Sequence, residues 1–427
     1  MTPAPRVPEE LSARVPAEQR GTGLGRDGVR LLVSRGTLVS HHAFVELPRL
    51  LRAGDLLVVN TSPTLAAAVD GTLGHARVVV HFSTRGDDGR WSVELREPDG
   101  RGTTRAWAGG PEGAVVGLPG GGGLVLEEPV VGLPGGAGSG VGLSGAAGVG
   151  VGVGLPGGTG PGVGLPRKAG AVLGSVASGP VLEGPVGTGP VLEQAVGSVG
   201  RRLWWARVSD PDVPGLLRAH GRAIRYAYTE RDQPLSAYQT VFALPSPDGS
   251  GSAEMPSAAR PFTARLVAEL VSRGVQFAPV RLDTGVASVE AHEPPYPERF
   301  TVPEASARLV NAVRAGDGRV IAVGTTAVRA LESAVGPSGA VRAAQGWTDL
   351  VVDPGRGVRA VDGILTGLHE PQASHLLMLE AVAGRAAVDR GYEAALRGRY
   401  LWHEFGDVHL LLPEENPHAK GCSGNCW

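Results

Sequence analysis

The stretch GRVIAVGTTAVRALESAV, residues 318–335, decides the fold of this 427-residue chain. Its first part, RVIAVG (319–324), has the composition of a buried β-strand that ends in glycine. The second part carries apolar Val328, Leu331 and Val335 at helical spacing. A strand that turns directly into a helix leaves free backbone N–H groups at the helix N-terminus, and open α/β folds bind ligands at that carboxyl edge of the sheet. The sequence therefore predicts an α/β sheet with a candidate binding site at this turn.

Hydroxyl and charged side chains follow the turn at Gly324. Of Thr325 and Thr326, one can cap the helix while the other can point at a ligand. Arg329 and Glu332 lie on the helix face opposite the apolar stripe, so we expect their side chains outside the core. The alternative is purely structural, namely an N-cap followed by a solvated i,i+3 ion pair.

Strand and helix patterns alternate around this stretch, which indicates an α/β core with at least partly parallel strands. Strand-like runs are DLLVVN (55–60), VQFAPVRL (275–282) and DVHLLLP (407–413), and helix-like runs are FTARLVAELVSRG (262–274), VPEASARLVNAVRAG (302–316) and one or two helices over 373–398. We assign this larger domain to residues 1–66 and 211–413.

A second group of strands interrupts the larger domain. ARVVVHFSTR (76–85) and RWSVELREP (90–98) have strand composition and are separated by GDDG, a hairpin signal. RRLWWARVSD (201–210), which follows the Gly/Pro-rich segment, again has the composition of a strand. These runs predict a small antiparallel β-domain, made of residues 67–108 and 201–210, that is inserted into the larger one.

Residues 109–200 have a different composition, rich in Gly, Pro and Val. The motif VGLPGG repeats at 116–121, 131–136 and 153–158. Gly and Pro every few residues would break a membrane-spanning helix, so we interpret the whole segment as a disordered, elastin-like linker.

Bulk composition narrows the classes of function. The formal net charge of −2 gives no global basic field that would attract nucleic acid, although a local patch is possible. Cys422 and Cys426 are too few for a four-ligand zinc site or a core disulfide framework, and we expect no metal. Both lie in residues 414–427, which we expect to be a flexible tail.

Residues 1–20 lack the apolar core of a signal peptide, which predicts a cytoplasmic protein that does not enter a membrane.

Further candidate residues precede apolar runs or form a charge cluster. Tyr238 and Gln239 stand ahead of the apolar part of SAYQTVFA, where the alternative is a loop that enters a strand. Arg222 belongs, with Arg218 and Arg225, to a small basic cluster that can meet phosphates. The alternative for that cluster is a solvated helix face.

Two histidine-containing segments suggest proton transfer. In LHEPQAS (368–374), His369 can act as a general acid or base, and Ser374 can cap the helix that follows. A lone loop histidine with a structural role is the alternative. WHEFGDVHLL places His403, Glu404 and Asp407 ahead of the last strand, at a spacing that matches no tight metal site.

Taken together, these segments resemble the S-adenosylmethionine:tRNA ribosyltransferase-isomerase family of queuosine biosynthesis. The resemblance covers nearly the whole chain apart from the Gly/Pro-rich linker and the tail, and RVIAVGTTAVRALES is its most specific match. The other motifs that carry it are PEELSARVPAEQR (8–20), LLRAGDLLVVNTSP (50–63), YQTVFA (238–243), GSAEMPSAARPFT (251–263), VDGILTGLHEP (361–371), HLLMLEAVAG (375–384) and YLWHEFGDVHLL (400–411).

The resemblance implies a fold and a reaction. The fold is a larger α/β domain with an inserted small antiparallel β-barrel. The reaction transfers the ribosyl part of S-adenosylmethionine, the cosubstrate, to 7-aminomethyl-7-deazaguanine in tRNA. The ribose rearranges to an epoxycyclopentanediol while adenine and methionine leave, which gives epoxyqueuosine-tRNA. We expect tRNA as the partner and a monomeric enzyme.

The resemblance and the local patterns together give a predicted site. We assign catalysis to His369, Glu332 and Asp407. We assign binding of S-adenosylmethionine to Gly324, Thr325, Thr326, Arg329 and Ser374, and contact with the acceptor substrate to Asn60, Tyr238, Gln239, Ser257, Arg222 and Glu298.

The chain departs from the family pattern at several polar positions. Pro63 and Ala68 stand where the family usually carries Arg, and the loop Pro-Thr-Ala-Gly-Leu-His-Phe reads Pro-Ser-Ala-Ala-Arg-Pro-Phe at 256–262. Leu-His-Val-Gly reads Leu-Asp-Thr-Gly at 282–285, and a later His-x-Glu keeps only Glu298. Lost Arg side chains weaken phosphate binding, and lost His side chains remove options for proton transfer.

These departures leave two alternatives open for the function. The first is an enzyme that still uses S-adenosylmethionine but acts on a small-molecule acceptor. The second is a non-catalytic RNA- or ligand-binding protein on the same scaffold.

Overall fold

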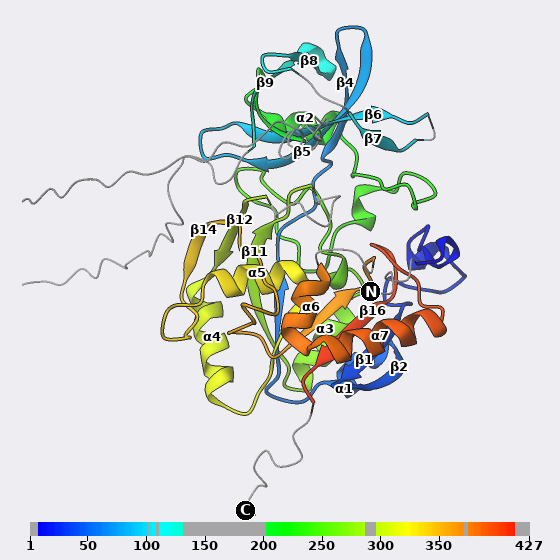
Figure 1. The fold of residues 1–427 in the computed structure, drawn as a ribbon, viewed down its shortest axis with the longest axis vertical. Helices are drawn as coiled ribbons and strands as arrows, with labels where there is room; N and C mark the ends of the chain where they lie inside the picture. Colours follow the sequence, from blue (N-terminus) through cyan, green and yellow to red (C-terminus); the bar gives the residue numbers. More distant parts are fainter. Residues whose placement is uncertain are drawn as a thin grey trace, which may run out of the picture. The chain divides into compact units, whose positions relative to one another are not determined.

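The computed structural model describes residues 7–100, 102–107, 111–130, 202–286, 296–370 and 375–414. They belong to one compact unit, residues 1–144 and 200–427, and they form two β-sheets with helices (Figure 1). Ser374, the two cysteines and most of the expected linker lie outside the described residues. Within the described part, no helix has the length and apolar character needed to cross a bilayer.

The larger sheet contains nine of the described strands. In spatial order they are β14 (Ala344–Thr348), β12 (Glu298–Val302), β11 (Gln276–Asp283), β3 (Leu56–Asn60), β13 (Val320–Val323), β15 (Gly363–Gly367), β16 (Val408–Leu412), β1 (Arg30–Arg35) and β2 (Leu38–Ala43). Strands β11, β3, β13 and β15 are parallel, and so are β16 and β1, whereas the other neighbours are antiparallel. The mixed pattern confirms the predicted α/β class.

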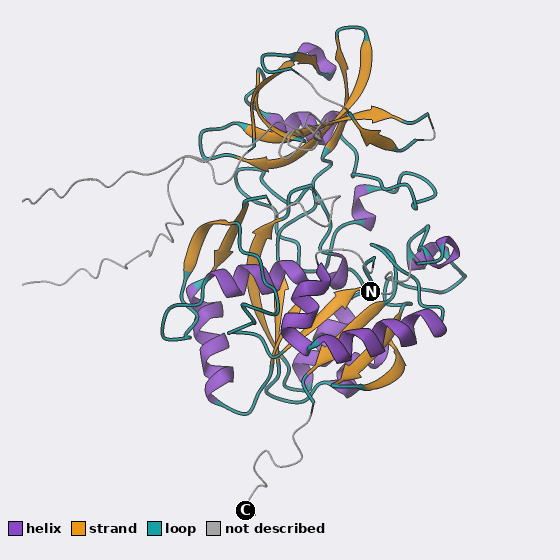
Figure 2. Ribbon diagram, viewed as in Figure 1, coloured by secondary structure: helices purple, strands orange, loops and turns teal. Residues whose placement is uncertain are grey.

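Helices cover both faces of this sheet (Figure 2). On β3, Leu56 and Val58 pack into one apolar cluster while Leu57 and Val59 pack into another, because successive side chains of a strand point to opposite faces. The first cluster is completed by α4 (Glu304–Ala315), α5 (Thr325–Ser333), α6 (His375–Ala383) and α7 (Arg385–Arg397), and the second by α1 (Leu47–Leu50) and α3 (Ala264–Ser272). The pattern over 373–398 is thus two helices, which are separated at Gly384.

The smaller sheet closes into an antiparallel barrel. Its strands are, in order, β10 (Leu203–Val208), β9 (Gly123–Pro129), β8 (Val115–Gly117), β4 (Ala68–Leu73), β5 (Ala76–Arg85), β6 (Trp91–Pro98) and β7 (Thr104–Ala106). A further pairing of β10 with β6 closes a ring of six strands and leaves β7 outside it. Helix α2 (Val213–His220) packs onto the barrel core. The inserted barrel is therefore confirmed.

One predicted boundary is wrong. The segment 111–130, which we expected to be linker, supplies β8, a 3-10 turn (Pro119–Gly121) and β9 to the barrel. Val116 and Leu118 from the first VGLPGG motif, and Leu124 and Leu126 from β9, are buried in the barrel core. The Gly and Pro residues of this motif make a tight turn between two strands, which composition alone did not distinguish from a linker.

Candidate active site

A cavity of about 300 Å³ opens at the carboxyl ends of two parallel strands. Gly324, Thr325 and Thr326 line it from the β13–α5 turn, and Thr366 and Gly367 line it from the end of β15. This is the edge of the sheet at which the sequence predicts a site, and the volume lies at the lower end of the range for small-ligand pockets.

The β13–α5 turn depends on a glycine. Gly324 has φ +89°, a backbone conformation that side chains other than glycine rarely adopt. It is the N-cap of α5, and because it has no side chain, no side-chain cap satisfies the first helical turn. Thr325 and Thr326 are therefore the first residues of the helix and not its cap, so their hydroxyls and the first backbone N–H groups are available to a ligand.

Four buried polar atoms around the cavity have no hydrogen-bond partner in the described part of the chain. They are Oγ1 of Thr284, Oγ1 of Thr366, Nδ1 of His375 and Oε2 of Glu404, and all four residues line the cavity. A buried polar atom without a partner costs about 1–3 kcal/mol, so the four atoms need partners from outside the described chain, which water or a polar ligand in the cavity can supply.

Two imidazole rings lie face to face in the cavity. His369 and His375 stack with ring centroids 4.5 Å apart and planes 5° apart. Burial lowers the pKa of His369 well below its ordinary range, and the nearby His375 and His403 lower it further. Burial also lowers the pKa of His375. Both rings are therefore neutral near pH 7 and carry a nitrogen that can accept a proton.

A second stack of rings forms another part of the cavity wall. Tyr228 stacks on His403, with centroids 3.9 Å and planes 10° apart, and Tyr226 continues the stack with a centroid 5.6 Å from that of Tyr228. The hydroxyl of Tyr228 donates to Glu404, and the hydroxyl of Tyr226 donates to Glu254. The stack presents a rigid, apolar face of the kind on which planar rings bind.

Burial sets the protonation of this wall. Burial raises the pKa of Glu404, and the hydrogen bond from Tyr228 offsets this increase only in part. Burial also raises the pKa of Tyr228, and the neighbouring Glu404 raises that pKa further. For His403, burial lowers the pKa to about 4. Near pH 7, Tyr228 is therefore a neutral donor and His403 is a neutral ring.

Six residues of the predicted site line this cavity. They are Gly324, Thr325, Thr326, His369, Tyr238 and Ser257. Tyr238 is 5% exposed, and burial raises its pKa to about 12, so it is a neutral phenol at ordinary pH. The structure thus brings together candidates that lie as much as about 130 residues apart in the sequence.

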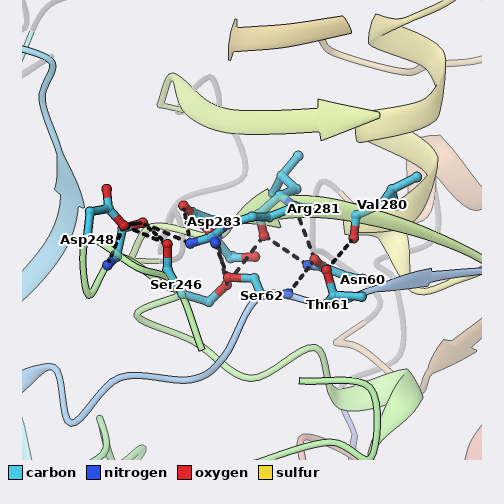
Figure 3. A network of polar contacts seen from close by, with 12 residues as sticks. Asn60, Thr61, Ser62, Ser246, Asp248, Val280, Arg281 and Asp283 are labelled. Atoms are coloured by element: carbon cyan, nitrogen blue, oxygen red, sulfur yellow. Dashed lines mark hydrogen bonds and ion pairs between the residues drawn. The ribbon is translucent and has the colours of Figure 1, made fainter. Parts of the chain in front are cut away.

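Asn60 belongs to a network of polar contacts (Figure 3) and does not itself line the cavity. Its amide nitrogen donates to the carbonyl of Leu282 at 2.9 Å and to the Thr326 hydroxyl at 3.3 Å, while its oxygen accepts from the N–H groups of Leu282 and Ser62. Ser62 in turn donates to Asp283 at 2.6 Å. Every hydrogen-bonding atom of the Asn60 side chain is used, so the residue ties β3 to β11 and orients Thr326.

Arg329 and Glu298 lie outside the cavity lining and bind each other. The guanidinium of Arg329 donates to the Glu298 carboxylate and to the carbonyls of Leu350 and Thr348. Glu298 also accepts the N–H of Gly285 at 2.9 Å. Neither charge is available to a ligand in this structure, which differs from the assignment of Arg329 to S-adenosylmethionine and of Glu298 to the acceptor.

Glu332 and Asp407, both predicted to be catalytic, also lie outside the lining. Glu332 is 2% exposed and accepts from Arg356 and from the N–H groups of Arg359 and Ala360. The expectation that it faces away from the core is therefore wrong, because the 356–360 loop covers it. Asp407 accepts from Arg30 and from the N–H of Leu401. Both carboxylates hold loops in place.

The two remaining predicted residues lie beside the cavity. Gln239 exchanges hydrogen bonds with the backbone of Thr64, which lines the cavity. Arg222 pairs with Asp70 at 2.8 Å and lines a neighbouring cavity of about 540 Å³. Thr64 and Ala223 line both cavities, so Arg222 lies close to the candidate site without entering it.

Most of the cavity wall formed by Tyr228, His403 and Glu404 is absent from the site that the sequence predicts. His403 and Glu404 precede Asp407 in the sequence, but only Asp407 is among the residues that the sequence predicts for the site. His375 and Thr366 occur inside matched motifs and carried no local signal. Tyr228 follows the basic cluster and has no neighbouring pattern that indicates a site. Their common feature, a position at one end of the sheet, is a property of the tertiary structure.

Comparison with known proteins assigns the family. The family model described as "Queuosine biosynthesis protein" matches residues 6–106 and 184–411. The chain belongs to this family. An S-adenosylmethionine:tRNA ribosyltransferase-isomerase from Gloeobacter violaceus is 30% identical over 415 residues, which cover 95% of this chain and 94% of that relative.

Other members of the queuosine biosynthesis family match over a shorter length. The S-adenosylmethionine:tRNA ribosyltransferase-isomerase of Symbiobacterium thermophilum is 38% identical over 194 residues, 44% of this chain and 55% of the relative. For several relatives of this kind, the chain spans only about half of their length. A solved S-adenosylmethionine tRNA ribosyltransferase structure from Thermotoga maritima aligns with a TM-score of 0.44 at 22% identity, over 96% of this chain and 99% of that chain.

Within this family, the altered 256–262 loop contributes both to the cavity and to the core. Ser257 and Ala258 line the cavity. Arg260 points away from it, because its guanidinium donates to both carboxylate oxygens of Glu18, at 2.9 and 3.0 Å, and its Nε donates to the carbonyl of Ala237. The arginine of this loop is therefore structural.

Proposed function

We propose that this chain transfers and isomerises the ribosyl part of S-adenosylmethionine onto 7-aminomethyl-7-deazaguanine in tRNA, with release of adenine and methionine. Membership of the queuosine biosynthesis family supports this reaction. The single observation that carries it is the cavity at the β13–α5 turn with its four unpaired polar atoms. A nucleoside with an amino-acid side chain supplies many donors and acceptors for such atoms.

The start of α5 suits the polar groups of S-adenosylmethionine. The helix N-terminus carries a partial positive charge and free N–H groups, which favour a carboxylate or hydroxyl oxygens. Thr325 and Thr326 add two hydroxyls at the same place, and Asn60 holds that of Thr326. The unpaired hydroxyls of Thr284 and Thr366 are suited to the ribose hydroxyls.

His369 is suited to proton transfer. The sulfonium of S-adenosylmethionine acidifies its neighbouring 5′ carbon, so a neutral base beside it can start the rearrangement. His369 is neutral because its pKa is lowered, and its ring is held parallel to that of His375. Once protonated, the same ring is strongly acidic and can deliver the proton to the departing adenine.

The neighbouring cavity supports tRNA as the carrier of the acceptor. Arg218 and Arg222 line it, and it shares Thr64 and Ala223 with the candidate active site. Two arginines beside the site can contact backbone phosphates while the base enters. We further expect the enzyme to be cytoplasmic, monomeric and independent of metal. Size-exclusion chromatography and activity in the presence of a chelator test the last two points.

The test is a direct assay of both products. The full chain is incubated with S-adenosylmethionine and tRNA that carries 7-aminomethyl-7-deazaguanine, and free adenine and the heavier tRNA nucleoside are measured by mass spectrometry. We expect both. Adenine release with the free base but not with the tRNA would support the small-molecule alternative, and binding of S-adenosylmethionine without adenine release would support the non-catalytic one.

A variant of His369 and a matched control test whether His369 transfers the proton. We expect His369→Gln to lower adenine release by about 10²–10⁴-fold. The control His42→Gln, on β2 and outside the cavity lining, should leave the rate unchanged. Full activity in His369→Gln would show that another group takes the proton.

A further inference from the structure

Glu404 is the carboxylate of the cavity whose bonding is least complete. Its Oε1 accepts from the Tyr228 hydroxyl, whereas its Oε2 is enclosed and has no hydrogen-bond partner in the described part of the chain. The other two carboxylates of the lining differ from it. Glu254 accepts from Tyr226, and Glu370 is 49% exposed and lies 3.8 Å from the His403 ring.

The part of the cavity around Glu404 is lined by neutral and acidic groups. Its titratable neighbours in that lining are Tyr228, Tyr238 and His403, which are neutral near pH 7, and the carboxylate of Glu370. The guanidinium of Arg260 lies outside the lining, over the ring of Phe405, and pairs with Glu18. Neither Arg nor Lys occurs among the described residues that line the cavity. An enclosed carboxylate oxygen without a cation or a donor is complementary to a ligand that brings both, namely an ammonium group.

The loop that carries Glu404 is held in a fixed conformation. His403 has φ +74°, and its N–H donates to the carbonyl of Leu368 at 3.1 Å. The Asp407 carboxylate accepts the N–H of Leu401 at 2.7 Å, and the Gly406 N–H donates to the His403 carbonyl at 2.9 Å. Asp407 is therefore a positioning residue for the wall made by His403 and Glu404.

We propose that Glu404 binds the ammonium group of the acceptor base and takes its proton, with the Tyr228–His403 stack as the wall against which the base lies. This inference rests on the proposed function, which supplies an acceptor with a primary amine. An alkylammonium has an ordinary pKa of about 10, so the group arrives protonated and cannot act as a nucleophile until a base removes one proton.

The proton transfer is balanced within the site. The ammonium loses one proton and becomes a neutral amine with a free electron pair, and the Glu404 carboxylate gains that proton and becomes a neutral acid. Solvent receives the proton at the end of the cycle. S-adenosylmethionine also carries two cationic groups, but its sulfonium has no proton on sulfur to give, and its α-ammonium is not the nucleophile of the proposed reaction. The raised pKa of Glu404 makes it a stronger base than an exposed glutamate.

A binding measurement tests the recognition step without turnover. The full chain is titrated by calorimetry with 7-aminomethyl-7-deazaguanine and with 7-methyl-7-deazaguanine, which lacks the amine. We expect the aminomethyl base to bind at least about tenfold more tightly to the wild type, and we expect Glu404→Gln to abolish the difference. Glu393→Gln, an exposed carboxylate on α7, is the control that should keep it. Equal binding of the two bases to the wild type, or a difference retained in Glu404→Gln, would overturn the inference.

The pH profile tests the proton transfer itself. We expect Glu404→Gln to lower kcat/KM for the acceptor by about 10²-fold or more at pH 7 and by much less near pH 9.5, because solution then supplies the free amine. Tyr228→Phe, which removes the donor to Oε1, should shift the acidic limb of the profile to higher pH. A loss in Glu404→Gln that is the same at every pH, or weaker binding of S-adenosylmethionine, would show a structural or cosubstrate role instead.

The two proposals fail in different ways. A wild-type chain that releases no adenine would remove the proposed reaction, while the two-base titration would still decide whether Glu404 recognises the ammonium. Conversely, a wild-type chain that turns over normally and a Glu404→Gln variant that matches it at pH 7 would remove only the role of Glu404.

Discussion

The guanidinium of Arg329 donates to the carboxylate of Glu298 and thereby ties helix α5 to strand β12. The side chains are only 12% and 9% exposed. Because α5 begins at the cavity, this pair fixes the helix whose N-terminus is proposed to hold the cosubstrate, and it does so from outside the cavity.

Arg329→Ala is expected to destabilise the fold. It leaves Glu298 buried without its counter-charge, which costs about 3–5 kcal/mol of the free energy of unfolding. Urea denaturation measures this loss, and Arg308→Ala, which removes an exposed pair with Glu304 on α4, should cost less than about 1 kcal/mol. S-adenosylmethionine should still bind to the folded variant with an affinity within a few-fold of the wild type. A loss of binding without a loss of stability would return Arg329 to the site.

Gly324→Ala is expected to affect both stability and binding. The φ of +89° would impose a strain of about 1–3 kcal/mol on alanine, and relaxation of that strain would displace Thr325 and Thr326. Gly54→Ala is a matched control, because Gly54 has φ +90° and no atom within 4 Å of an added Cβ. Both variants should unfold at lower urea concentration, but only Gly324→Ala should weaken binding of S-adenosylmethionine. Equal binding by the two variants would contradict the site at this turn.

Thr366→Val is expected to separate stability from binding. The Thr366 side chain is 1% exposed and its hydroxyl has no partner in the described part of the chain, so the isosteric valine should leave the free protein as stable as the wild type or more stable. Loss of a hydroxyl that pairs with the ligand should weaken binding of S-adenosylmethionine by about tenfold.

Thr348→Val gives the opposite outcome and serves as the control. The Thr348 hydroxyl lies 2.7 Å from that of Ser333, outside the cavity lining, so its loss should lower stability and leave binding unchanged. Thermal melts and calorimetric titrations of both threonine variants distinguish the cases. A destabilised Thr366→Val with normal binding would mean that the hydroxyl serves the core.

Glu404→Gln is expected to change the pH-dependence of stability. Burial raises the pKa of Glu404 in the folded state above its value in the unfolded state. The unfolded chain therefore releases this proton first as pH rises, so the stability that the group contributes at low pH is lost as pH rises through the folded pKa. The glutamine variant should melt at a higher temperature than the wild type at pH 8, and the two should converge near pH 4. A lower melting temperature of the variant at pH 8 would show that the ionised carboxylate is stabilised by a partner.

The fold was predictable where a single segment contains a clear apolar run or a helical spacing of apolar residues. RVIAVGTTAVRALES gave β13 and α5, and the apolar run before Asn60 gave β3. Strands β1, β2, β12, β14 and β15 were missed. Three of them, β2, β12 and β14, lie in antiparallel pairs near the edges of the sheet, where exposed and polar residues dilute the apolar signal, as in β2 with its two histidines. In β1, the buried apolar run is only the three residues Leu31, Leu32 and Val33. β15 is short and contains two glycines.

The site was predictable only in part, because local spacing does not show what covers a helix face. The i,i+3 spacing suggests a pair between Arg329 and Glu332, but Arg329 binds Glu298 and Glu332 binds the loop at 356–360 instead. The hydroxyls at the turn and His369 were found because a strand end or a loop histidine is recognisable along the chain. The Tyr228–His403–Glu404 wall joins residues about 175 positions apart, which no local pattern records.

The closure of the barrel by β9 and β10 has a consequence for how this chain can vary. Pro129 and Trp204 are cross-strand neighbours, and the N–H of Val130 donates to the carbonyl of Leu203 at 2.9 Å. The pairing of β9 with β10 thus holds Pro129 and Trp204, which lie on either side of residues 131–201, close together. The entropic penalty of a longer connection between them grows only by about 0.6 kcal/mol for each doubling of its length. We therefore expect the barrel to keep its register when the number of repeats between these two strands changes.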